Sequence, residues 1–251
     1  MKSTTTLRTA AVLALALSCA SLARAQLTNS GFETGNLTGW QISAGGHASA
    51  VGSVVDYPID PWTLTEDLTH PYWVSPYAGN FQARLVAGGT PLAGVESFLQ
   101  LSAGLLSTTV NNRFGLADAS AIAQNVWLNA GDSLRVHWNF LAVDTSGTND
   151  FAFLSLSSAS GSSLSILSSV TGVGSGQGTG WQTATVTAST TGQYRLGLGV
   201  ANFEDNTIGS ILYADAISAV PEPSTYGIAA AIICLGAAVW RRRHTAAAAT
   251  R

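Results

Sequence analysis

The sequence predicts an all-β, jelly-roll-like β-sandwich, and three observations support this prediction. Between Gln26 and Val220, short runs of β-branched, aromatic and aliphatic residues alternate with polar residues, which is the period of two expected of half-buried strands. Clusters of Gly, Asn, Asp and Ser separate these runs at fairly even spacing. The same stretch shows almost no helical periodicity. Many short strands without helices are typical of a sandwich or a jelly roll.

The first element is a predicted signal peptide over residues 1–25. Basic side chains near the start precede an apolar run over residues 10–20, and a small-x-small cleavage site ends at Ala25. Cleavage between Ala25 and Gln26 leaves a predicted β-sandwich ectodomain over residues 26–219. A domain of this length is large enough to bury a substantial core without further support.

The ectodomain is strongly acidic and contains no cysteine. Between Gln26 and Val220, thirteen acidic residues outnumber four arginines, which gives a net charge of −9 against −3 for the whole chain. Nucleic acid and anionic membrane surfaces are therefore poor partners, whereas divalent cations and neutral polymers are better candidates. Both cysteines, Cys19 and Cys234, lie in the terminal segments, so we expect no disulfide, cysteine nucleophile or thiolate metal site in the ectodomain. Lipidation at Cys19 is the weaker alternative to ordinary cleavage.

The segment from Asp56 to Tyr77 is predicted to be a long ordered loop and not a strand pair. It holds four of the seven prolines of the chain. Long loops on a rigid sandwich often carry function. Its candidate sugar-stacking residues are Tyr57, Trp62, Tyr72 and Trp73. The alternative is an aromatic flap packed over an open end of the sandwich, and the exposure of the two tryptophans distinguishes these readings.

The strands that follow are predicted from alternation. Residues 122–128 and 134–143 are expected to form a hairpin around a turn at 129–132. The later strands are predicted at residues 151–156, 163–168, 181–187, 194–200 and 211–217, with a glycine-rich loop at 171–180. The acidic loop at 144–150 is interpreted as a surface hairpin connection, with a second cation site as the alternative.

The last strand carries the most informative acid. Asp215 is predicted to share an apolar face with Ile211, Tyr213 and Ile217, and a carboxylate there is costly unless it is paired or binds a cation. Glu33 is the expected companion, because first and last strands are often neighbours in jelly rolls. With Asn29 and backbone carbonyl groups, these acids form a candidate structural Ca²⁺ site, since Ca²⁺ prefers several oxygen ligands. The alternative is that Asp215 caps a turn or pairs with an arginine.

The opening of the ectodomain supports this interpretation by resemblance. The pattern that runs from Asn29 through Phe32 and Glu33 to Trp40 resembles the first strand of galactose-binding-like jelly rolls, a fold shared by many carbohydrate-binding modules. In those domains such an opening pairs with a final strand that carries an Asp, here Asp215. The resemblance implies a jelly-roll fold and, in several carbohydrate-binding examples, calcium at this place. It says little about activity.

The tail of the chain is predicted to pass through a membrane. Residues 224–240 contain no charge and are long enough for a thin transmembrane helix. A cluster of three arginines, Arg241, Arg242 and Arg243, follows this helix. Because positive residues favour the cytoplasmic side, we expect residues 244–251 to form a cytoplasmic tail.

Three residues before the helix indicate what kind of C-terminal signal the tail is. Pro221, Glu222 and Pro223 form an extended linker, because proline restricts the backbone and lacks an N–H group. With the apolar helix and the arginines, residues 220–243 resemble the PEP-CTERM sorting signal of Gram-negative bacteria. The resemblance implies processing near this motif by an exosortase, a membrane-embedded cysteine protease, and delivery to the cell surface or extracellular matrix. The alternative is a plain C-terminal anchor.

No pattern in the sequence indicates catalysis. The zinc-protease, nucleophile-elbow, phosphate-loop and dinucleotide-binding motifs are missing from the sequence, so we expect the chain not to be an enzyme. We therefore expect an exported, exosortase-sorted protein with a structural or adhesive role in exopolysaccharide. The alternative is a carbohydrate-binding module with a specific glycan ligand at residues 56–77. A secreted hydrolase is a remote alternative, because it would need two carboxylates close together in a cleft.

Overall fold

The computed structural model describes residues 27–60, 65–109, 117–144, 149–203 and 208–220, together with Gly236. Several sequence predictions lie outside these residues. They are the signal peptide at 1–25 with its cleavage between Ala25 and Gln26, the side chain of Trp62, the motif Pro221-Glu222-Pro223, the helix at 224–240 apart from Gly236, the arginines 241–243 and the tail 244–251. Within the described part of the chain, no helix is long and apolar enough to cross a membrane.

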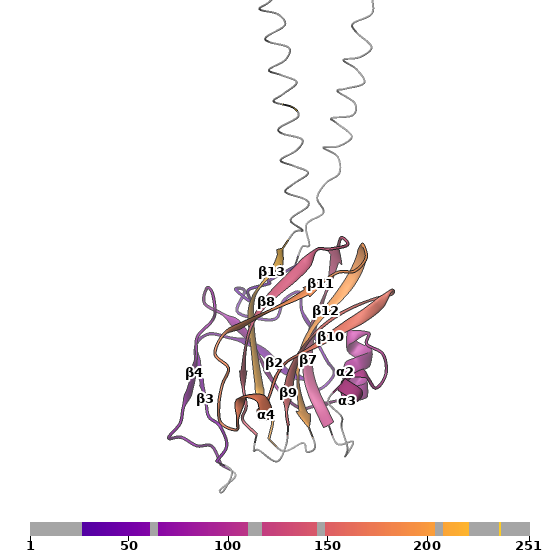
Figure 1. The fold of residues 1–251 in the computed structure, drawn as a ribbon. Coiled ribbons are helices and arrows are strands. Elements are labelled where there is room, and N and C mark those ends of the chain that lie inside the picture. Colours follow the sequence, from indigo (N-terminus) through magenta and orange to yellow (C-terminus); the bar gives the residue numbers. More distant parts are fainter. Residues whose placement is uncertain are drawn as a thin grey trace, which may run out of the picture.

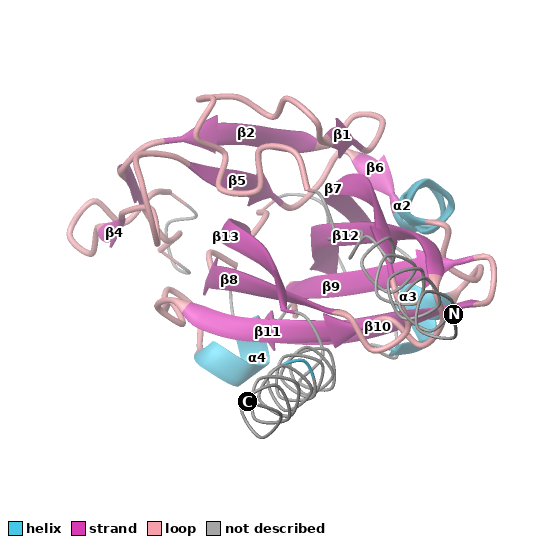
Figure 2. Ribbon diagram, turned by 90° about the horizontal axis from the view of Figure 1, so that it is seen from above, coloured by secondary structure: helices cyan, strands magenta, loops and turns pink. Residues whose placement is uncertain are grey.

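Two antiparallel sheets pack face to face, which confirms the predicted all-β sandwich (Figures 1 and 2). The first, called the β7 sheet, contains β1 (Gln41–Ile42), β6 (Thr90–Pro91), β7 (Ala117–Leu128), β9 (Phe151–Ser158), β10 (Gly161–Ser169) and β12 (Gly192–Phe203). Its order is β1-β7-β12-β9-β10, and β6 also pairs with β7. The second, called the β8 sheet, contains β2 (His47–Val51), β5 (Gln82–Val86), β8 (Ser133–Leu141), β11 (Gln182–Thr187) and β13 (Ile211–Val220). Its order is β11-β8-β13-β5-β2.

The predicted hairpin between residues 122–128 and 134–143 is wrong, although both strands exist. β7 pairs with β12, whereas β8 pairs with β11 and β13, so the two strands lie in opposite sheets. The turn at 129–132 does form, with the amide of Asp132 donating to the carbonyl of Asn129 at 3.0 Å. It carries the chain across the sandwich. Alternation identifies a strand with one buried face, but it does not reveal the strand's partner.

Alternating residues build the core between the sheets, as the sequence predicts. On β8 the buried set is Leu134, Val136, Trp138 and Phe140, and on β12 it is Tyr194, Leu196, Leu198 and Val200. Side chains of the opposite parity on β8, which include Arg135 and His137, lie on the outer face of the β8 sheet. This outer face therefore carries polar groups.

Between residues 27 and 220, the described part of the chain contains three short helices, which corrects the expectation of almost no helix. They are α2 (Leu92–Leu99), α3 (Leu105–Thr109) and α4 (Val170–Val173). α2 and α3 cover the outer face of the β7 sheet (Figure 2), where the alanines of β7 leave room for Val95 and Leu99. The buried Glu96 accepts hydrogen bonds from the amides of Gly104 and Leu106, both at 2.8 Å, and so joins the two helices. One two-turn helix offers too few repeats for its period to stand out.

The opening segment also differs from its predicted form. Residues 29–40 form consecutive turns and not a first strand. Phe32 and Trp40 are buried in the core, with ring centroids 5.5 Å apart. The segment nevertheless lies against the last strand, because the amide of Ile217 donates to the carbonyl of Ser30 at 3.0 Å.

A bulge in β13 corrects the predicted face of Ile217. Ala216 has a φ of 47°, and the pairing register with β8 shifts between Asp215 and Ser218. The bulge turns Ile217 into the core between the sheets, while Asp215 stays on the outer side with Tyr213. The two residues therefore do not share a face.

The segment at 56–77 is partly a strand pair, which the sequence did not predict. β3 (Val54–Asp56) pairs with β4 (Tyr72–Val74), and together with residues 57–60 and 65–71 they form a flap. The flap lies at the side of the β8 sheet, opposite to α2 and α3 (Figures 1 and 2). Val74 packs with Leu141, Ile211 and Tyr213 in a cluster outside the main core. The flap thus covers part of the outer face of the β8 sheet.

Candidate functional site

An ion pair joins the flap to the β8 sheet. Arg84 on β5 donates to Asp56 on β3 through Nε at 2.9 Å and Nη2 at 2.5 Å, and the hydroxyl of Tyr213 donates to the same carboxylate. Burial alone would lower the pKa of Arg84, but the hydrogen bonds and the charge of Asp56 raise it. Burial and the charge of Asp56 raise the pKa of Tyr213. Arg84 and Tyr213 therefore keep their protons at neutral pH, as the contact requires.

Tyr72 makes a second attachment of the flap. Its hydroxyl donates to Oδ1 of the buried Asn139 on β8 at 2.8 Å and accepts from the amide of Gly180 at 3.2 Å. Tyr72 is half-buried, so it is a packing residue and not an open stacking surface. Trp73, the next residue, points away and is 75% exposed. Tyr57 is half-buried.

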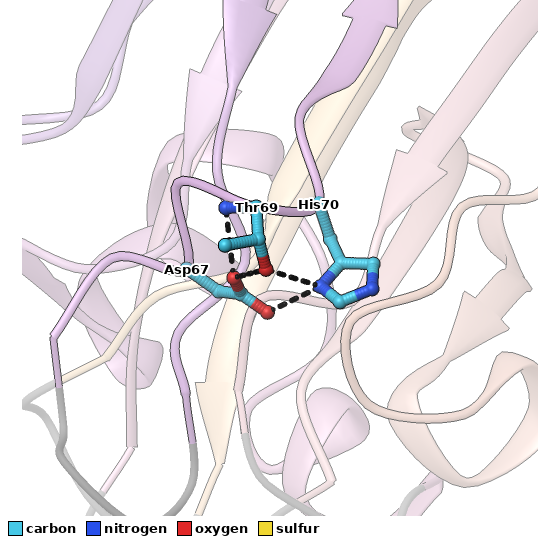
Figure 3. Close-up of polar contacts among 3 residues, drawn as sticks. All are labelled: Asp67, Thr69 and His70. Atoms are coloured by element: carbon cyan, nitrogen blue, oxygen red, sulfur yellow. Dashed lines mark hydrogen bonds and ion pairs between the residues drawn. The ribbon is translucent and has the colours of Figure 1, made fainter.

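The tip of the flap is ordered by a local set of hydrogen bonds (Figure 3). Asp67 accepts from the amide and the hydroxyl of Thr69 at 2.9 and 2.5 Å, and its other oxygen lies 2.7 Å from Nδ1 of His70. Hydrogen bonds from Thr69 and then from His70 lower the pKa of Asp67 to about 2. The side chain of His70 is 77% exposed. These contacts stay within one turn, so they fix the shape of the tip of the flap.

An aromatic cluster stands beside the flap on the outer face of the β8 sheet. The rings of Tyr77 and His137 are stacked, with centroids 3.7 Å apart and planes 10° apart. Trp181 meets Tyr77 edge-on at 5.7 Å, and its Nε1 donates to the carbonyl of Ser75 at 3.0 Å. Thr183 lies 3.1 Å from Nδ1 of His137. Tyr77 is 49% exposed, so the cluster presents an aromatic surface that is already held in place.

The histidine of this cluster favours its neutral form. Burial and the nearby positive charge of Arg135 lower the pKa of His137. A neutral imidazole can stack on Tyr77 without bringing a charge into the cluster. The aromatic surface is therefore uncharged at neutral pH.

A small pocket of about 290 Å³ brings together the two acids that the sequence paired. Glu33 and Asp215 both line it, and a Cβ atom added at Gly31 would lie 3.7 Å from Oδ1 of Asp215 and 3.8 Å from Cγ of Glu33. Burial raises the pKa of Asp215 against hydrogen bonds from backbone amides, and the charge of Glu33 raises it further. The proximity predicted from a first and a last strand is thus present, although a turn takes the place of the first strand.

Backbone amides of residues 77–81 hold both carboxylates. The amide of Ala78 donates to Asp215 at 2.9 Å, and the amides of Asn80 and Phe81 donate to Glu33 at 3.0 to 3.2 Å. The same segment begins with Tyr77 of the aromatic cluster. Asp215 is also the cross-strand partner of His137 in the pairing of β13 with β8. The acidic pocket and the aromatic cluster are therefore parts of one site.

Asn29 does not join the two acids through its side chain. Its Oδ1 accepts from the amide of Thr34 at 3.2 Å, and its Nδ2 donates to the carbonyl of Asn36 at 2.8 Å. The side chain thus organises the opening turns. No group of three or more His, Cys, Asp or Glu side chains suited to a metal ion occurs among the described residues.

Sequence reasoning missed His137 and Trp181 as members of the site. The alternation of β8 correctly places His137 on the outer face of its strand. The contact itself comes from three segments that are far apart in the chain. Only the pairing of β11 with β8 and the path of residues 75–81 bring those segments together.

The acidic loop at 144–150 corrects another expectation, because its two flanking acids are not on the surface. Asp144 and Asp150 are 1% and 0% exposed. Asp150 accepts from the amides of Phe203 and Ser210 at 2.9 and 2.8 Å. Burial, with a contribution from the charge of Asp144, raises the pKa of Asp150 to about 7. Asp150 thus joins β9 to the ends of β12 and β13.

No protein-family model matches the sequence, and no curated protein matches it. Solved structures with a similar fold include TmCBM61 in complex with beta-1,4-galactotriose, with a TM-score of 0.42 and 14% identity over 79% of this chain and 99% of that one. Family 16 Carbohydrate Binding Module-2 has a TM-score of 0.38 and 17% identity over 78% and 99%. The K1 adhesin domain of Lys-gingipain from Porphyromonas gingivalis has a TM-score of 0.37 and 12% identity over 76% and 96%. At these TM-scores, the similarities assign neither a ligand nor an activity to this chain.

Proposed function

We propose that the ectodomain binds a glycan at the aromatic cluster of Tyr77, His137 and Trp181. The observation that carries this proposal is the half-exposed ring of Tyr77, which is fixed by stacking on His137 and by the edge of Trp181. A rigid aromatic surface suits the apolar face of a sugar ring, because little side-chain freedom is lost when the sugar binds. In this proposal the aromatic cluster, and not the aromatic residues predicted within residues 56–77, is the main contact surface for the glycan.

The surroundings of the cluster favour a neutral or weakly charged glycan. Thr183 and Thr185 are exposed on β11 opposite His137 and Arg135 of β8, and they offer hydroxyl groups for hydrogen bonds. A strongly anionic polymer would meet an ectodomain with a net charge of −9, counted from Gln26 to Val220. Exposed Trp73 on the flap supplies a further stacking surface if the polymer is long.

A structural or adhesive role without a defined sugar site is the second candidate. The docking of the flap through Asp56 and Tyr72 favours it, because these contacts use flap residues to cover the β8 sheet. The two candidates differ in whether the aromatic cluster binds a sugar. Neither requires the chain to be an enzyme.

Export and sorting belong to the same proposal and rest on the sequence. The signal peptide at residues 1–25 and the tail at 220–243 support export followed by exosortase processing in a Gram-negative bacterium. The product would lie at the cell surface or in the extracellular matrix, where exopolysaccharide is available as a ligand. The tail would anchor the chain in the membrane before processing.

A structural Ca²⁺ in the pocket of Glu33 and Asp215 is a further part of the proposal. Two carboxylates fit this ion, and it would offset their mutual repulsion, while the amide of Asn29 is engaged elsewhere. Bound Ca²⁺ would stabilise residues 77–81 and hence the position of Tyr77. We expect Ca²⁺ to raise the melting temperature of the full chain after EDTA treatment.

Variants of single acids test the ion separately from the glycan. Glu33→Gln should abolish the effect of Ca²⁺ on the melting temperature, whereas Glu66→Gln, at an exposed position of the flap, should leave it unchanged. An identical melting temperature of the unaltered chain in EDTA and in Ca²⁺ would refute the calcium site. That result would not affect the proposal that the aromatic cluster binds a glycan.

Affinity electrophoresis of the full chain in gels that contain single polysaccharides tests glycan binding. We expect at least one neutral polysaccharide to retard the unaltered chain, and Tyr77→Ala and Trp181→Ala to remove the retardation. Trp127→Ala is the matched control, because Trp127 is 52% exposed but lies on β7, away from the cluster. Equal retardation of all four proteins would refute this site, and no retardation by any polysaccharide, the host's own included, would favour the structural role.

A further inference from the structure

Strand β10 leaves one edge of the β7 sheet open. It is the terminal strand of that sheet, and among the described residues only β9 pairs with it. With nine residues, β10 is longer than the edge strands β1, β2 and β11, which have two, five and six. Every second residue of such a strand directs its backbone N–H and C=O groups outward. These groups can pair with another strand.

The edge lacks the residues that usually prevent such pairing. No Asp, Glu, Lys, Arg, His or Pro occurs between Asp150 and Arg195, a stretch that includes all of β9, β10 and β11. Exposed edges are commonly protected by charged side chains or proline. β10 and β11 lie along the same side of the sandwich (Figure 2), so the edge strands of both sheets on this side are uncharged.

Two apolar side chains of β10 support pairing on the outer face. Leu164 and Ile166 lie opposite Ser155 and Phe153 of β9, and Ile166 is 38% exposed. The register shifts between Ile166 and Ser168, so regular pairing is limited to residues 161–166. A partner strand along these residues would cover Ile166 and extend the apolar strip that Leu164 forms with the outer cluster.

We propose that β10 pairs antiparallel with β10 of a second copy of this chain, around a two-fold axis near Leu164. A two-fold axis perpendicular to the sheet keeps outer residues beside outer residues, so Leu164 meets its own copy and Ser162 meets Ile166. The charge distribution favours a second copy at this side. Two ectodomains of net charge −9 repel each other, but no ionisable side chain lies on the facing strands.

The dimer would join the two β7 sheets and leave both β8 sheets open. The aromatic cluster of Tyr77 lies on the β8 sheet and takes no part in the contact. Dimerisation is therefore independent of glycan binding. Where both occur, two clusters in one particle would increase the avidity for a repeating polymer.

Light scattering with size-exclusion chromatography on the full chain in a mild detergent tests the dimer. We expect a mass of two chains that falls toward one chain on dilution. Ile166→Lys should weaken the dimer about tenfold or more, because the substitution puts two positive charges into the pairing region. Ser49→Lys is the matched control, since Ser49 is an exposed serine on the edge strand β2 of the other sheet, and it should leave the dissociation unchanged.

A cross-link tests the register without relying on the lysine variant. In a chain whose Cys19 and Cys234 are replaced by alanine, Leu164→Cys should form a disulfide-linked dimer under mild oxidation, and Ser49→Cys should not. A single-chain mass at every concentration reached would overturn the proposal. Equal weakening by both lysine variants, equal cross-linking at both cysteines, or oligomers that grow beyond two chains would also overturn it.

Discussion

Gly79 determines whether Glu33 can reach the amides that hold it. Gly79 has a φ of 71°, and a Cβ atom at this position would overlap the carboxylate of Glu33. We expect Gly79→Ala to destabilise the chain by about 2–3 kcal/mol, because backbone strain and the overlap both act against the folded state. Thermal unfolding of the full chain measures the loss.

The control for this variant is Gly104→Ala. Gly104 has a similar φ of 78°, but no atom lies within 4 Å of its added Cβ. This substitution should therefore cost only the backbone strain, about 1 kcal/mol. Equal losses of stability for the two variants would mean that the overlap with the Glu33 carboxylate does not destabilise the folded chain.

Asp150 predicts a dependence of stability on pH. Its pKa is about 7 in the folded chain against 3.8 for the unperturbed group, so the folded state keeps a proton that the unfolded state releases. The stabilisation is complete below about pH 4 and is lost as the pH rises to about 7, by up to about 4 kcal/mol. We expect the melting temperature of the full chain to fall across this range.

Asp150→Asn separates this effect from other titrations. The amide cannot ionise, so the fall in melting temperature between pH 4 and pH 7 should become smaller. At pH 4 the variant should be less stable than the unaltered chain, because one of the amides of Phe203 and Ser210 loses its acceptor. An unchanged slope in the variant would contradict the assigned pKa.

At the scale of elements, an ion pair is one of the contacts that attach the flap to the β8 sheet. Asp56 on β3 contacts Arg84 on β5, and their side chains are 15% and 24% exposed. Asp56→Ala leaves the guanidinium of Arg84 partly buried without its partner, so we expect a loss of about 3 kcal/mol. The flap should also become sensitive to proteases. Limited proteolysis with mass spectrometry measures cleavage between β3 and β4.

Asp67→Ala is the comparison for the ion pair. Asp67 lies in the same flap, but its partners Thr69 and His70 belong to its own exposed turn (Figure 3). Asp67→Ala should change proteolytic cleavage within the turn and leave the attachment of β3 to the β8 sheet intact. Release of the whole flap by Asp67→Ala, or none by Asp56→Ala, would contradict the role of the ion pair.

Individual strands were more predictable than their arrangement. In β8 and β12 the period of two identifies the buried residues, because each strand has one face in the core. The turn at 129–132 is equally compatible with a hairpin and with a crossing between sheets, so the sequence does not reveal which occurs. The sequence pattern also gives no sign of the bulge at Ala216. This bulge places Ile217 on the face opposite to the predicted one.

At the scale of the whole molecule, the class of fold was predictable and the site only in part. The pairing of Glu33 with Asp215 followed from the cost of a carboxylate on an apolar face and from a resemblance to known jelly rolls. The stack of Tyr77 on His137 required the actual path of residues 75–81 across β8. Long-range contacts of this kind depend on loop conformation, which local patterns do not determine.

The proposed sorting of the molecule gives a prediction about its final covalent form. Mass spectrometry of the protein recovered outside its native cells should find an N-terminus at Gln26 and a C-terminus near Pro221-Glu222-Pro223. Replacing these three residues with alanine should leave the protein in the membrane fraction with its tail. Recovery of an external protein that still carries Arg241–Arg243 would contradict processing at the motif.

The central claim is that a glycan covers the aromatic cluster, and hydroxyl-radical footprinting tests it most directly. The full chain would be oxidised with and without the exopolysaccharide of the cell that produces it, and modification of each aromatic side chain would be measured. We expect the polysaccharide to protect Tyr77 and Trp181 and to leave Trp127 unchanged. Bound polysaccharide with undiminished oxidation of Tyr77 and Trp181, or with protection at Trp127 instead, would contradict the claim.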